Sequence, residues 1–424
     1  MRVIILASFL LLVCASARGQ TAAEMKLATD SERAAGAAYR AKNYEEFLKQ
    51  IEIANENRPN HPRLIYNRAI AYALNGRKED ALISLERLTK MGLAFAFEKN
   101  EDLKEFRNDE RFKAIVTAAA NNLKPVGEST KALQLRDKTM IAESVAYDAK
   151  TKTFYLGSIH QRKIVAVDTS GIETGFSSPD DGLDAVLGMK VDSKRGFLWA
   201  ASSAIGQMRG FTEADKGRSG VFKYDLRSRK LIKKYLLPAG EQHMLGDVWL
   251  DASGNVYATD SVSPNIYRID ATSDSIKPFI PSDVFASLQG ITGGAKANEL
   301  YVADYAKGIF RIALKSKAIV QLKPDANVTV LGIDGLYFHR GRLIAIQNGI
   351  TPNRVAAFGV EGDRITSTSV LEANHPDFLE PTLGVISGDD FYYVANSQWP
   401  LVNEKAELQT EKLREPVVLR LKLK

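Results

Sequence analysis

Residues 246–270 read GDVWLDASGNVYATDSVSPNIYRID, and this stretch decides the fold. Apolar and polar residues alternate through Val248–Leu250 and again through Val256–Thr259, with the turn residues 251–255 between them. A third alternating segment, Ile266–Ile269, follows after a second interruption. Alternation with a period of two, broken by turn residues, predicts three short antiparallel strands. Because three strands cannot bury both of their faces alone, the unit needs neighbours.

The same unit recurs along the chain. Aligned on their turns, the copies begin at Glu143, Leu187, Gly246, Gln289, Asp334 and about Glu380. Their spacing is close to the roughly 40–50 residues of a four-stranded propeller blade. The sequence therefore predicts an all-β, six-bladed propeller over residues 131–424. The last copy leaves room for three strands, so we expect Lys131–Asp137 (KALQLRD) to supply the fourth strand and close the ring.

Residues 20–122 have a helical period of 3.6, so the chain combines an α-helical domain with the β-propeller. Four apolar positions recur with a spacing of 34 residues, as Ala35, Phe47, Ile51 and Ala54 and then Ala69, Ala81, Leu85 and Leu88. The pattern resembles the tetratricopeptide repeat, with Pro59 closing the first repeat and Asn75-Gly76 forming the turn in the second. The resemblance implies a groove that recruits a protein partner. The alternative is a packing and spacing element. Residues 123–130 are the predicted linker, because Pro125 and Gly127 break the helical pattern.

Residues 1–19 have the pattern of a secretory signal peptide. Arg2 precedes the apolar run Val3–Val13, and Ala15-Ser16-Ala17 is a small-residue cleavage site. The run is too short to span a bilayer, so we expect a secreted or periplasmic protein with no membrane span. Val13 before Cys14, the single cysteine, disfavours lipid anchoring. Cleavage removes Cys14 and with it any thiol nucleophile or disulfide.

Charge and motifs exclude several classes of function. Lys and Arg outnumber Asp and Glu by 57 to 51, but the two signs are interspersed. The chain has no basic cluster threaded with aromatic residues, so we expect no nucleic-acid partner. It also lacks the GxSxG, HExxH, Walker and GxGxxG motifs, which disfavours serine-nucleophile, zinc-protease and nucleotide chemistry.

The propeller topology predicts which polar residues share a face. First strands begin at the central channel, so one mouth of it is surrounded by Glu143, Asp247, Gln289, Asp334 and Glu380. Carboxylates in this arrangement favour a hard divalent cation, Ca²⁺ or a similar ion, because such ions prefer oxygen ligands. Glu143 and Asp334 head inner strands, where like charges converge at a cost unless a cation joins them.

The connections between blades emerge on the same face. They carry His243 and His375, and His160 falls on the same face; we expect these histidines to bind substrate together with Glu380, although surface histidines are the alternative. An insertion in the loop Ser203–Gly220 is predicted to cover the mouth and to offer Met208 and Phe211 to a small ligand. The alternative is a surface loop fastened by those two side chains. A second excursion over residues 397–415, which contains Trp399, is predicted to form another wall of the pocket.

Other acidic residues have structural explanations. Asp260 and Asp304 follow second strands in ATDS and VADY, and we expect them to bond their own turns. Asp148, Asp192 and Asp251 occupy one repeated hairpin position, which predicts a structural role for each of them.

The blades resemble the regucalcin and gluconolactonase family of six-bladed propellers, which hold a divalent metal at the channel mouth. Glu143 in IAESVAYD is similar to the family's first metal-binding glutamate, and Asp334 in IDGLYF matches its aspartate-glycine ligand motif. Gln289-Gly290 stands where the family has Asn-Gly, and Gly246-Asp247 where it has Asn-Asp. The resemblance implies a metal held by Glu143, Gln289 and Asp334, with Asp334 or Asp247 accepting a proton from water. It further implies hydrolysis of a lactone or related ester, the alternative being a noncatalytic ligand-binding or protein-interaction propeller.

Overall fold

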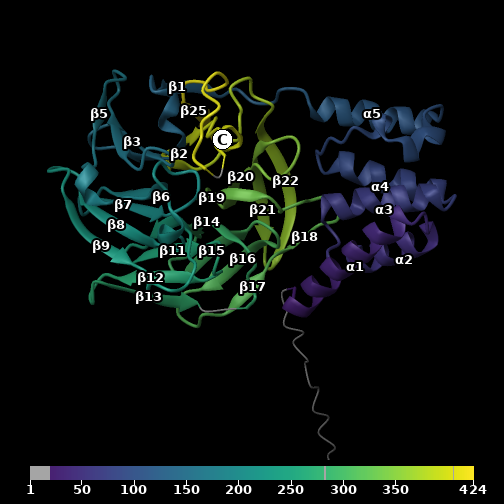
Figure 1. Cartoon of the computed structure of the whole chain (residues 1–424), viewed down its shortest axis with the longest axis horizontal. Coiled ribbons are helices and arrows are strands. Elements are labelled where there is room, and N and C mark those ends of the chain that lie inside the picture. Colours follow the sequence, from purple (N-terminus) through teal and green to yellow (C-terminus); the bar gives the residue numbers. More distant parts are fainter. Residues whose placement is uncertain (1–19, 281–282, 404) are drawn as a thin grey trace, which may run out of the picture.

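A computed structural model describes residues 20–280, 283–403 and 405–424. They form a helical domain beside an all-β, six-bladed propeller (Figure 1). The predicted fold class is therefore confirmed. The predicted signal peptide lies outside the described residues. Within the described ranges, every helix is too short or too polar to cross a bilayer.

The helical domain contains five α-helices, which are α1 (Ala22–Arg40), α2 (Tyr44–Asn57), α3 (Pro62–Leu74), α4 (Lys78–Lys90) and α5 (Glu110–Asn122). Two 3-10 helices, η1 (Phe97–Lys99) and η2 (Glu101–Phe106), precede α5. Thr21 caps α1 through a capping box with Glu24, and Asp109 Oδ1 accepts from Phe112 N at the start of α5. Gly76 has a φ of 74°, the left-handed conformation that turns the chain from α3 into α4 as predicted.

Helices α1 and α2 pack against each other, and α3 packs against α4. The eight repeated apolar positions predicted from the sequence are all buried in this domain, namely Ala35, Phe47, Ile51, Ala54, Ala69, Ala81, Leu85 and Leu88. The helical core predicted from that spacing is therefore confirmed. Its assignment to the tetratricopeptide type stays a prediction.

The first three blades are antiparallel sheets of consecutive strands. Blade 1 comprises β2 (Ala142–Asp148), β3 (Thr153–Ser158), β4 (Ile164–Val167) and β5 (Glu173–Gly175). Blade 2 comprises β6 (Ala185–Asp192), β7 (Phe197–Ser203), β8 (Ser219–Asp225) and β9 (Leu231–Leu236). Blade 3 comprises β10 (Leu245–Leu250), β11 (Val256–Asp260), β12 (Ile266–Asp270) and β13 (Ser275–Ile280).

The remaining blades complete the ring. Blade 4 comprises β14 (Leu288–Gly293), β15 (Glu299–Asp304), β16 (Gly308–Ala313) and β17 (Ile319–Gln321). Blade 5 comprises β19 (Ile333–His339), β20 (Arg342–Gln347), β21 (Arg354–Glu361) and β22 (Arg364–Ala373), with β18 (Lys323–Pro324) parallel to β22. Blade 6 comprises β23 (Gly384–Ser387), β24 (Asp390–Val394), β25 (Val417–Lys422) and β1 (Thr130–Gln134). The innermost strands β2, β6, β10, β14, β19 and β23 contact one another in sequence around the axis.

Strand β1 closes the ring by pairing with the last strand of the chain. It runs antiparallel to β25, with Thr130 opposite Arg420 and Gln134 opposite Val417. The predicted closure by the segment near Lys131–Asp137 is thus confirmed. Pairing the two ends of the propeller removes the open edge that blade 6 would otherwise expose.

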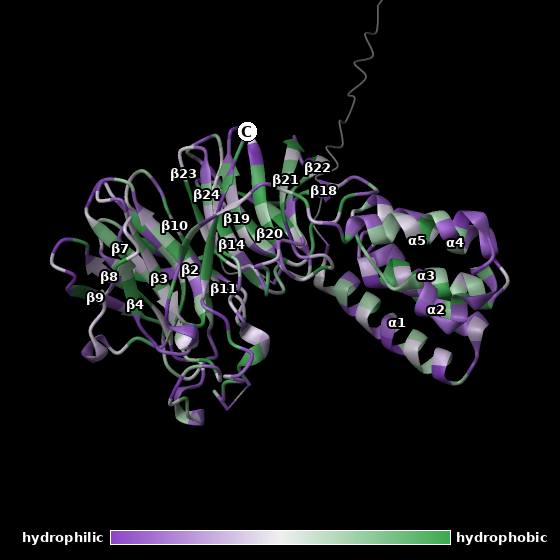
Figure 2. Cartoon of the chain, turned by 90° about the horizontal axis from the view of Figure 1, so that it is seen from above, coloured by the Kyte–Doolittle hydropathy of each residue, from purple (hydrophilic) through white to green (hydrophobic). Residues whose placement is uncertain are grey.

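The helical domain docks on blade 5 (Figure 2). Arg354 Nη1 donates to Met91 O at 2.9 Å, and Ala94 N donates to Thr351 O at 3.0 Å. Ile350 packs on the apolar core of the helices. These contacts join the two domains through backbone groups and buried side chains, so the helical domain contacts the propeller through a specific interface.

Candidate functional site

The inner strands of five blades share one irregularity. Their pairing with the second strand shifts between Ala142/Ser144, Val186/Met189, Leu245/Val248, Leu288/Ile291 and Ile333/Leu336. The residues inside these β-bulges include Glu143, Leu187, Asp247, Gln289 and Asp334. Bulges re-aim side chains locally, and here each of the five bulges contributes one of these side chains to the lining of one cavity.

This central cavity has a volume of about 190 Å³. Its lining contains every residue that the topology predicted around the channel mouth, namely Glu143, Asp247, Gln289, Asp334 and Glu380. The other lining residues are Leu187, Met244, Gly246, Tyr305, Asn348, Thr382, Leu383 and Trp399. The structure therefore brings together, from five blades, polar residues that are far apart in the chain.

Gly290 allows the bulges of β14 and β19 to approach each other. A Cβ atom at this position would lie 2.4 Å from Leu336 N and 2.6 Å from Asp334 O. Such distances are too short for any side chain, so glycine is required for this contact. The close approach positions the backbone of Asp334 at the edge of the cavity.

Glu143 is buried and held by the last blade. Its Oε2 accepts hydrogen bonds from Ser397 Oγ at 2.7 Å and from Trp399 Nε1 at 2.6 Å. Burial raises the pKa of Glu143 well above its usual range, and the neighbouring Asp334 charge raises it further. The two hydrogen bonds act in the opposite direction because they stabilise the carboxylate.

Asp334 is oriented by an amide. Asn348 Nδ2 donates to Asp334 Oδ2 at 2.8 Å, and Tyr305 Oη donates to Asn348 Oδ1 at 3.2 Å. Burial raises the pKa of Asp334 to about 7, with the charges of Glu380 and Asp247 adding to the shift and the Asn348 hydrogen bond opposing it. Near neutral pH the Asp334 carboxyl is therefore present in both its protonated and its ionised form.

Asp247 and Glu380 complete the acidic set. Asp247 Oδ1 accepts from Val248 N at 2.8 Å, and Oδ2 accepts from Ile291 N at 3.3 Å, which ties β10 to β14. Burial raises the pKa of Asp247, and the Lys190 charge opposes that shift. Burial also raises the pKa of Glu380, whose Oε2 is buried with no hydrogen-bond partner among the described residues. The φ of Glu380 is 65°, an uncommon conformation for a residue other than glycine.

The donor atoms in the cavity fit a hard divalent cation in their chemistry. Glu143 and Asp334 supply carboxylate oxygens, Gln289 supplies an amide oxygen, and Glu380 has a buried oxygen with no hydrogen-bond partner in the described part of the chain. Among residues 20–280, 283–403 and 405–424, no three His, Cys, Asp or Glu side chains already surround one point. The predicted ligand set of Glu143, Gln289 and Asp334 contains only two side chains of these types, so the finding does not conflict with it.

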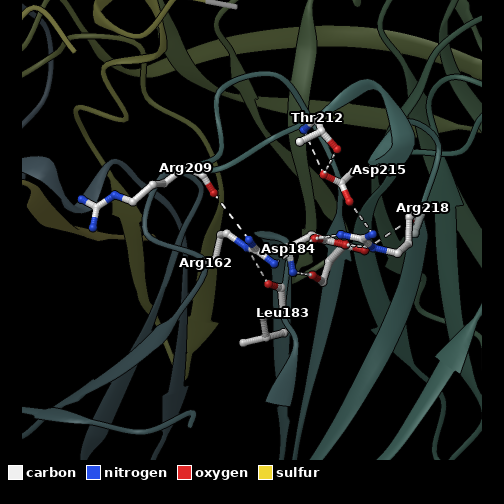
Figure 3. Close-up of polar contacts among 9 residues, drawn as sticks. Arg162, Leu183, Asp184, Arg209, Thr212, Asp215 and Arg218 are labelled. Atoms are coloured by element: carbon white, nitrogen blue, oxygen red, sulfur yellow. Dashed lines mark hydrogen bonds and ion pairs between the residues drawn. The ribbon is translucent and has the colours of Figure 1, made fainter. Parts of the chain in front are cut away.

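The long loop of blade 2 is fastened by ion pairs (Figure 3). Arg218 grips Asp184 with two hydrogen bonds, Nη2 to Oδ1 at 2.6 Å and Nε to Oδ2 at 2.8 Å. Arg218 Nη1 also contacts Asp215 Oδ1 at 2.6 Å, and Arg162 Nε donates to Leu183 O at 2.9 Å. The network ties residues 212–218 of the loop to the connection that leads into β6.

Apolar packing joins the same loop to the excursion of the last blade. Met208 is fully buried in a cluster with Leu187, Val402 and Leu413, and Trp399 and Phe211 pack against that cluster. Leu187 and Trp399 also line the cavity. The two loops therefore form one wall beside the cavity, and Met208 belongs to the core of that wall.

The three predicted histidines are engaged elsewhere. His160 Nδ1 lies 3.0 Å from Gln207 O, and His243 Nδ1 lies 2.7 Å from Asp260 Oδ2. His375 Nδ1 accepts from Asp377 N at 3.1 Å. Gln207 lies in the long loop of blade 2, Asp260 ends β11, and Asp377 lies in the same connection as His375. Each ring is therefore held by the loops or by a strand end, and none of the three lines the central cavity.

Asp260 and Asp304 serve their turns. Asp260 Oδ1 accepts from the backbone N of Met244, Val262 and Ser263. The oxygens of Asp304 accept from the backbone N of Ala286, Ser287, Ala306 and Lys307. The prediction that these residues bond local turns is confirmed. The hairpin residues Asp148, Asp192 and Asp251 do the same.

Sequence reasoning did not assign Tyr305, Thr382 or the direct contact of Trp399 with Glu143. Tyr305 follows Asp304 at the end of a second strand, and Asn348 stands at the matching position in blade 5. The residue that follows a second strand is therefore a sequence position from which a lining residue of this cavity could be predicted. Thr382 Oγ1 donates to Glu143 O at 2.7 Å, a backbone contact that no motif indicates.

The chain is thus a six-bladed propeller with a helical domain at its N-terminal side and an acidic cavity at its axis. No protein-family model matches its sequence, and no curated protein does so either. Similar solved structures include a gluconolactonase from Xanthomonas campestris, with 12% identity, a TM-score of 0.44, and coverage of 70% of this chain and 99% of that chain.

The luciferin-regenerating enzyme is similar at 14% identity and a TM-score of 0.48, over 70% of this chain and 95% of that chain. The PQQ-bound aldose sugar dehydrogenase from Streptomyces coelicolor is similar at 14% identity and a TM-score of 0.47, over 70% and 99% of the two chains. Gluconolactonase-type propellers, the class that the sequence resembles, are therefore among the structures similar to this chain. At these identities the similarity concerns the fold alone.

Proposed function

We propose that the central cavity binds a divalent cation together with a small lactone or related ester, and that the protein hydrolyses that ester bond. The observation that carries this proposal is the convergence of Glu143, Asp334 and Glu380 on one cavity. Converging carboxylates repel one another, and a cation among them removes that cost. Carboxylates of Glu143 and Asp334 and the amide oxygen of Gln289 would hold it, as Ca²⁺ or a similar ion.

Such a cation, when bound, polarises a substrate carbonyl and lowers the pKa of a bound water. The residues of the chain supply the rest. Asp334 or Asp247 accepts a proton from the attacking water, and Asp334 is the freer of the two because both Asp247 oxygens accept backbone hydrogen bonds. Glu380, whose Oε2 is buried and has no hydrogen-bond partner among the described residues, donates a proton to the leaving oxygen as the acyl–oxygen bond breaks.

The shape of the cavity limits the substrate. At about 190 Å³ it is smaller than the roughly 300–1,000 Å³ of drug-sized pockets, which favours a compact molecule. Leu187, Met244 and Leu383 offer apolar contact to its carbon skeleton, while Trp399 directs its indole N–H at Glu143. Export by the predicted signal peptide is part of this proposal and would place the reaction outside the cytoplasm.

A noncatalytic ligand-binding propeller is the second candidate. It is favoured by one observation, that Glu143 Oε2, Asp334 Oδ2 and both Asp247 oxygens already accept hydrogen bonds from the chain. Carboxylates satisfied in this way serve to hold the blades in place. In this case the helical domain would recruit a protein partner, and the cavity would bind a ligand without turnover.

A panel of lactones and esters, assayed with Ca²⁺, with Mg²⁺ and with EDTA, separates the two candidates. Hydrolysis that requires metal and is lost in Asp334→Asn supports the proposed function. Asp180→Asn is the matched control, because Asp180 is exposed on a connection between blades. Ligand binding without turnover would favour the noncatalytic candidate, and absence of both metal binding and turnover would contradict the hydrolase.

A further inference from the structure

A second cavity lies between the two domains. Its volume is about 520 Å³, and its lining includes Arg58, Arg87, Ala306, Lys307, Lys323 and Arg364. Arg58 follows α2 and Arg87 lies in α4, whereas the other four residues belong to blades 4 and 5. The cavity is therefore built by both domains, on the side of the propeller where β18 lies beside the helices (Figure 1).

The cations of this cavity give their hydrogen bonds to uncharged acceptors. Arg58 Nη2 donates to Ala306 O at 3.1 Å, and Arg87 Nε donates to Ala326 O at 2.9 Å. Lys307 Nζ donates to the backbone oxygens of Gln20 and Val284. Within the part of the chain that the structure describes, Arg364 alone among these cations has a carboxylate partner, Asp325.

Burial makes the lack of counter-ions costly. Lys307 is only 5% exposed, and burial lowers the pKa of Lys307, Arg58 and Arg87. The charges of Asp304, Asp283 and Glu24 oppose the shift of Lys307, and those of Glu32 and Asp304 oppose the shift of Arg58. Within the described residues, none of these carboxylates forms an ion pair with either cation, and the oxygens of Asp304 already accept four backbone N–H groups. Lys307, Arg58 and Arg87, which share this cavity without an ion-paired carboxylate among the described residues, therefore carry a desolvation cost that is only partly compensated.

The interface next to this cavity has the same character. Arg354 is 1% exposed, donates to Gln347 Oε1 and to Met91 O, and keeps Nη2 without a partner among the described residues. Burial lowers its pKa to about 10. Arg354 and Arg364 both line the adjoining cleft between the domains. The whole seam between helices and propeller is thus rich in positive charge.

We propose that the cavity between the domains binds an oxyanion, the phosphate or carboxylate group of a small molecule. Guanidinium groups from the helical domain and ammonium groups from the propeller would bind it from opposite sides. Both kinds of group form charge-assisted hydrogen bonds with oxyanions, which are stronger than hydrogen bonds between neutral groups. Its carbon skeleton would lie against Pro59, Leu322 and Val330. Because each domain supplies part of the site, the bound anion fixes the docking of the helices on the propeller. This site is separate from the acidic cavity at the axis and does not depend on its function.

The test measures anion binding to the full chain. Inorganic phosphate and succinate are titrated separately by calorimetry and by thermal melting, at constant ionic strength maintained with NaCl. We expect saturable binding of at least one anion, with a rise in Tm that follows its concentration. The double variant Arg58→Gln/Arg87→Gln should weaken the Kd at least tenfold. Arg227→Gln/Lys230→Gln, which alters two exposed cations of blade 2, should leave the Kd unchanged.

Lys323→Gln is a second test variant, which keeps the proposal testable if the double variant misfolds. Lys323 is exposed, so its replacement should preserve the fold and still weaken the Kd about threefold or more. The phosphate and succinate arms distinguish the two kinds of oxyanion. Absence of saturable binding for both anions overturns the proposal. So does equal affinity in the Lys323→Gln variant and in the control pair.

Discussion

Trp399 Nε1 donates a 2.6 Å hydrogen bond to Glu143 Oε2, so a loop of the last blade holds the carboxylate that heads the first. Ser397 Oγ donates to the same oxygen at 2.7 Å. The Glu143 backbone carbonyl accepts from Leu383 N and Thr382 Oγ1 of the same blade. The acidic cavity is therefore assembled across the point where the ring closes.

Trp399→Phe tests this relationship, because it keeps an aromatic ring and removes the donor. Loss of a hydrogen bond to a charged group costs about 1.5–3 kcal/mol, so Ca²⁺ affinity at pH 7 should fall about tenfold or more. Calorimetry of the purified variant measures it. Trp249→Phe, in blade 3, is the matched control. Unchanged affinity in Trp399→Phe would show that the indole does not tune Glu143.

Asp334→Ala should abolish both metal binding and turnover, since it removes one of the two proposed carboxylate ligands. Asp260→Ala should instead lower the Tm, because Asp260 Oδ1 accepts three backbone N–H groups. Calorimetry with Ca²⁺ and thermal melting of both variants separate the two effects. Full metal affinity in Asp334→Ala would remove this site and leave the noncatalytic candidate ahead.

Stability in the absence of metal should depend on pH through Asp334. Its pKa is raised to about 7, so between about pH 4 and pH 7 the folded protein binds more protons at this group than the unfolded chain. Stability from this group is therefore lost as pH rises through that range. Asp334→Asn should reduce this loss and melt several degrees higher than the parent protein at pH 8. An identical pH profile of Tm in both proteins would contradict the shifted pKa.

The loop over residues 204–218 should open when its ion pairs are removed. Asp184→Asn weakens the pair of hydrogen bonds that Asp184 accepts from Arg218, so the loop should become more accessible. Trypsin should then cleave after Arg209 or Lys216 several times faster than in the parent protein. The burial of Met208 predicts that deleting the whole loop also lowers the Tm. Asp180→Asn should leave the cleavage rate unchanged. Equal rates in both variants would show that apolar packing alone holds the loop.

Ring closure predicts a difference between two shortened chains. A chain beginning at Met140 lacks β1 and exposes the edge of β25, so it should aggregate. A chain beginning at Lys124 keeps β1 and should remain soluble, although it loses the contacts of the helices with blade 5. Light scattering and thermal melting compare them. Equal behaviour would contradict the role assigned to β1.

The sequence predicted the six blades because each repeats a period of two around turn residues, and it predicted closure because the last blade lacked a strand. It also predicted that Glu143, Asp247, Gln289, Asp334 and Glu380 gather at one mouth, since topology alone decides where inner strands begin. The β-bulges that aim these side chains were not predicted, because a bulge depends on the partner strand. The engagement of His160, His243 and Met208 depends on loop packing, which carries no periodic signal.

The pairing of β1 with β25 determines which parts of the chain can fold before the ring closes. Among the described strands, β25 (Val417–Lys422) comes last in the chain, and in its sheet β1 pairs with β25 alone. The helices and five blades can therefore take shape while the ring is still open, but the acidic cavity lacks Trp399 until the final blade arrives. On the proposed function, a chain whose ring is still open would therefore lack the Trp399 hydrogen bond that holds Glu143 in the cavity.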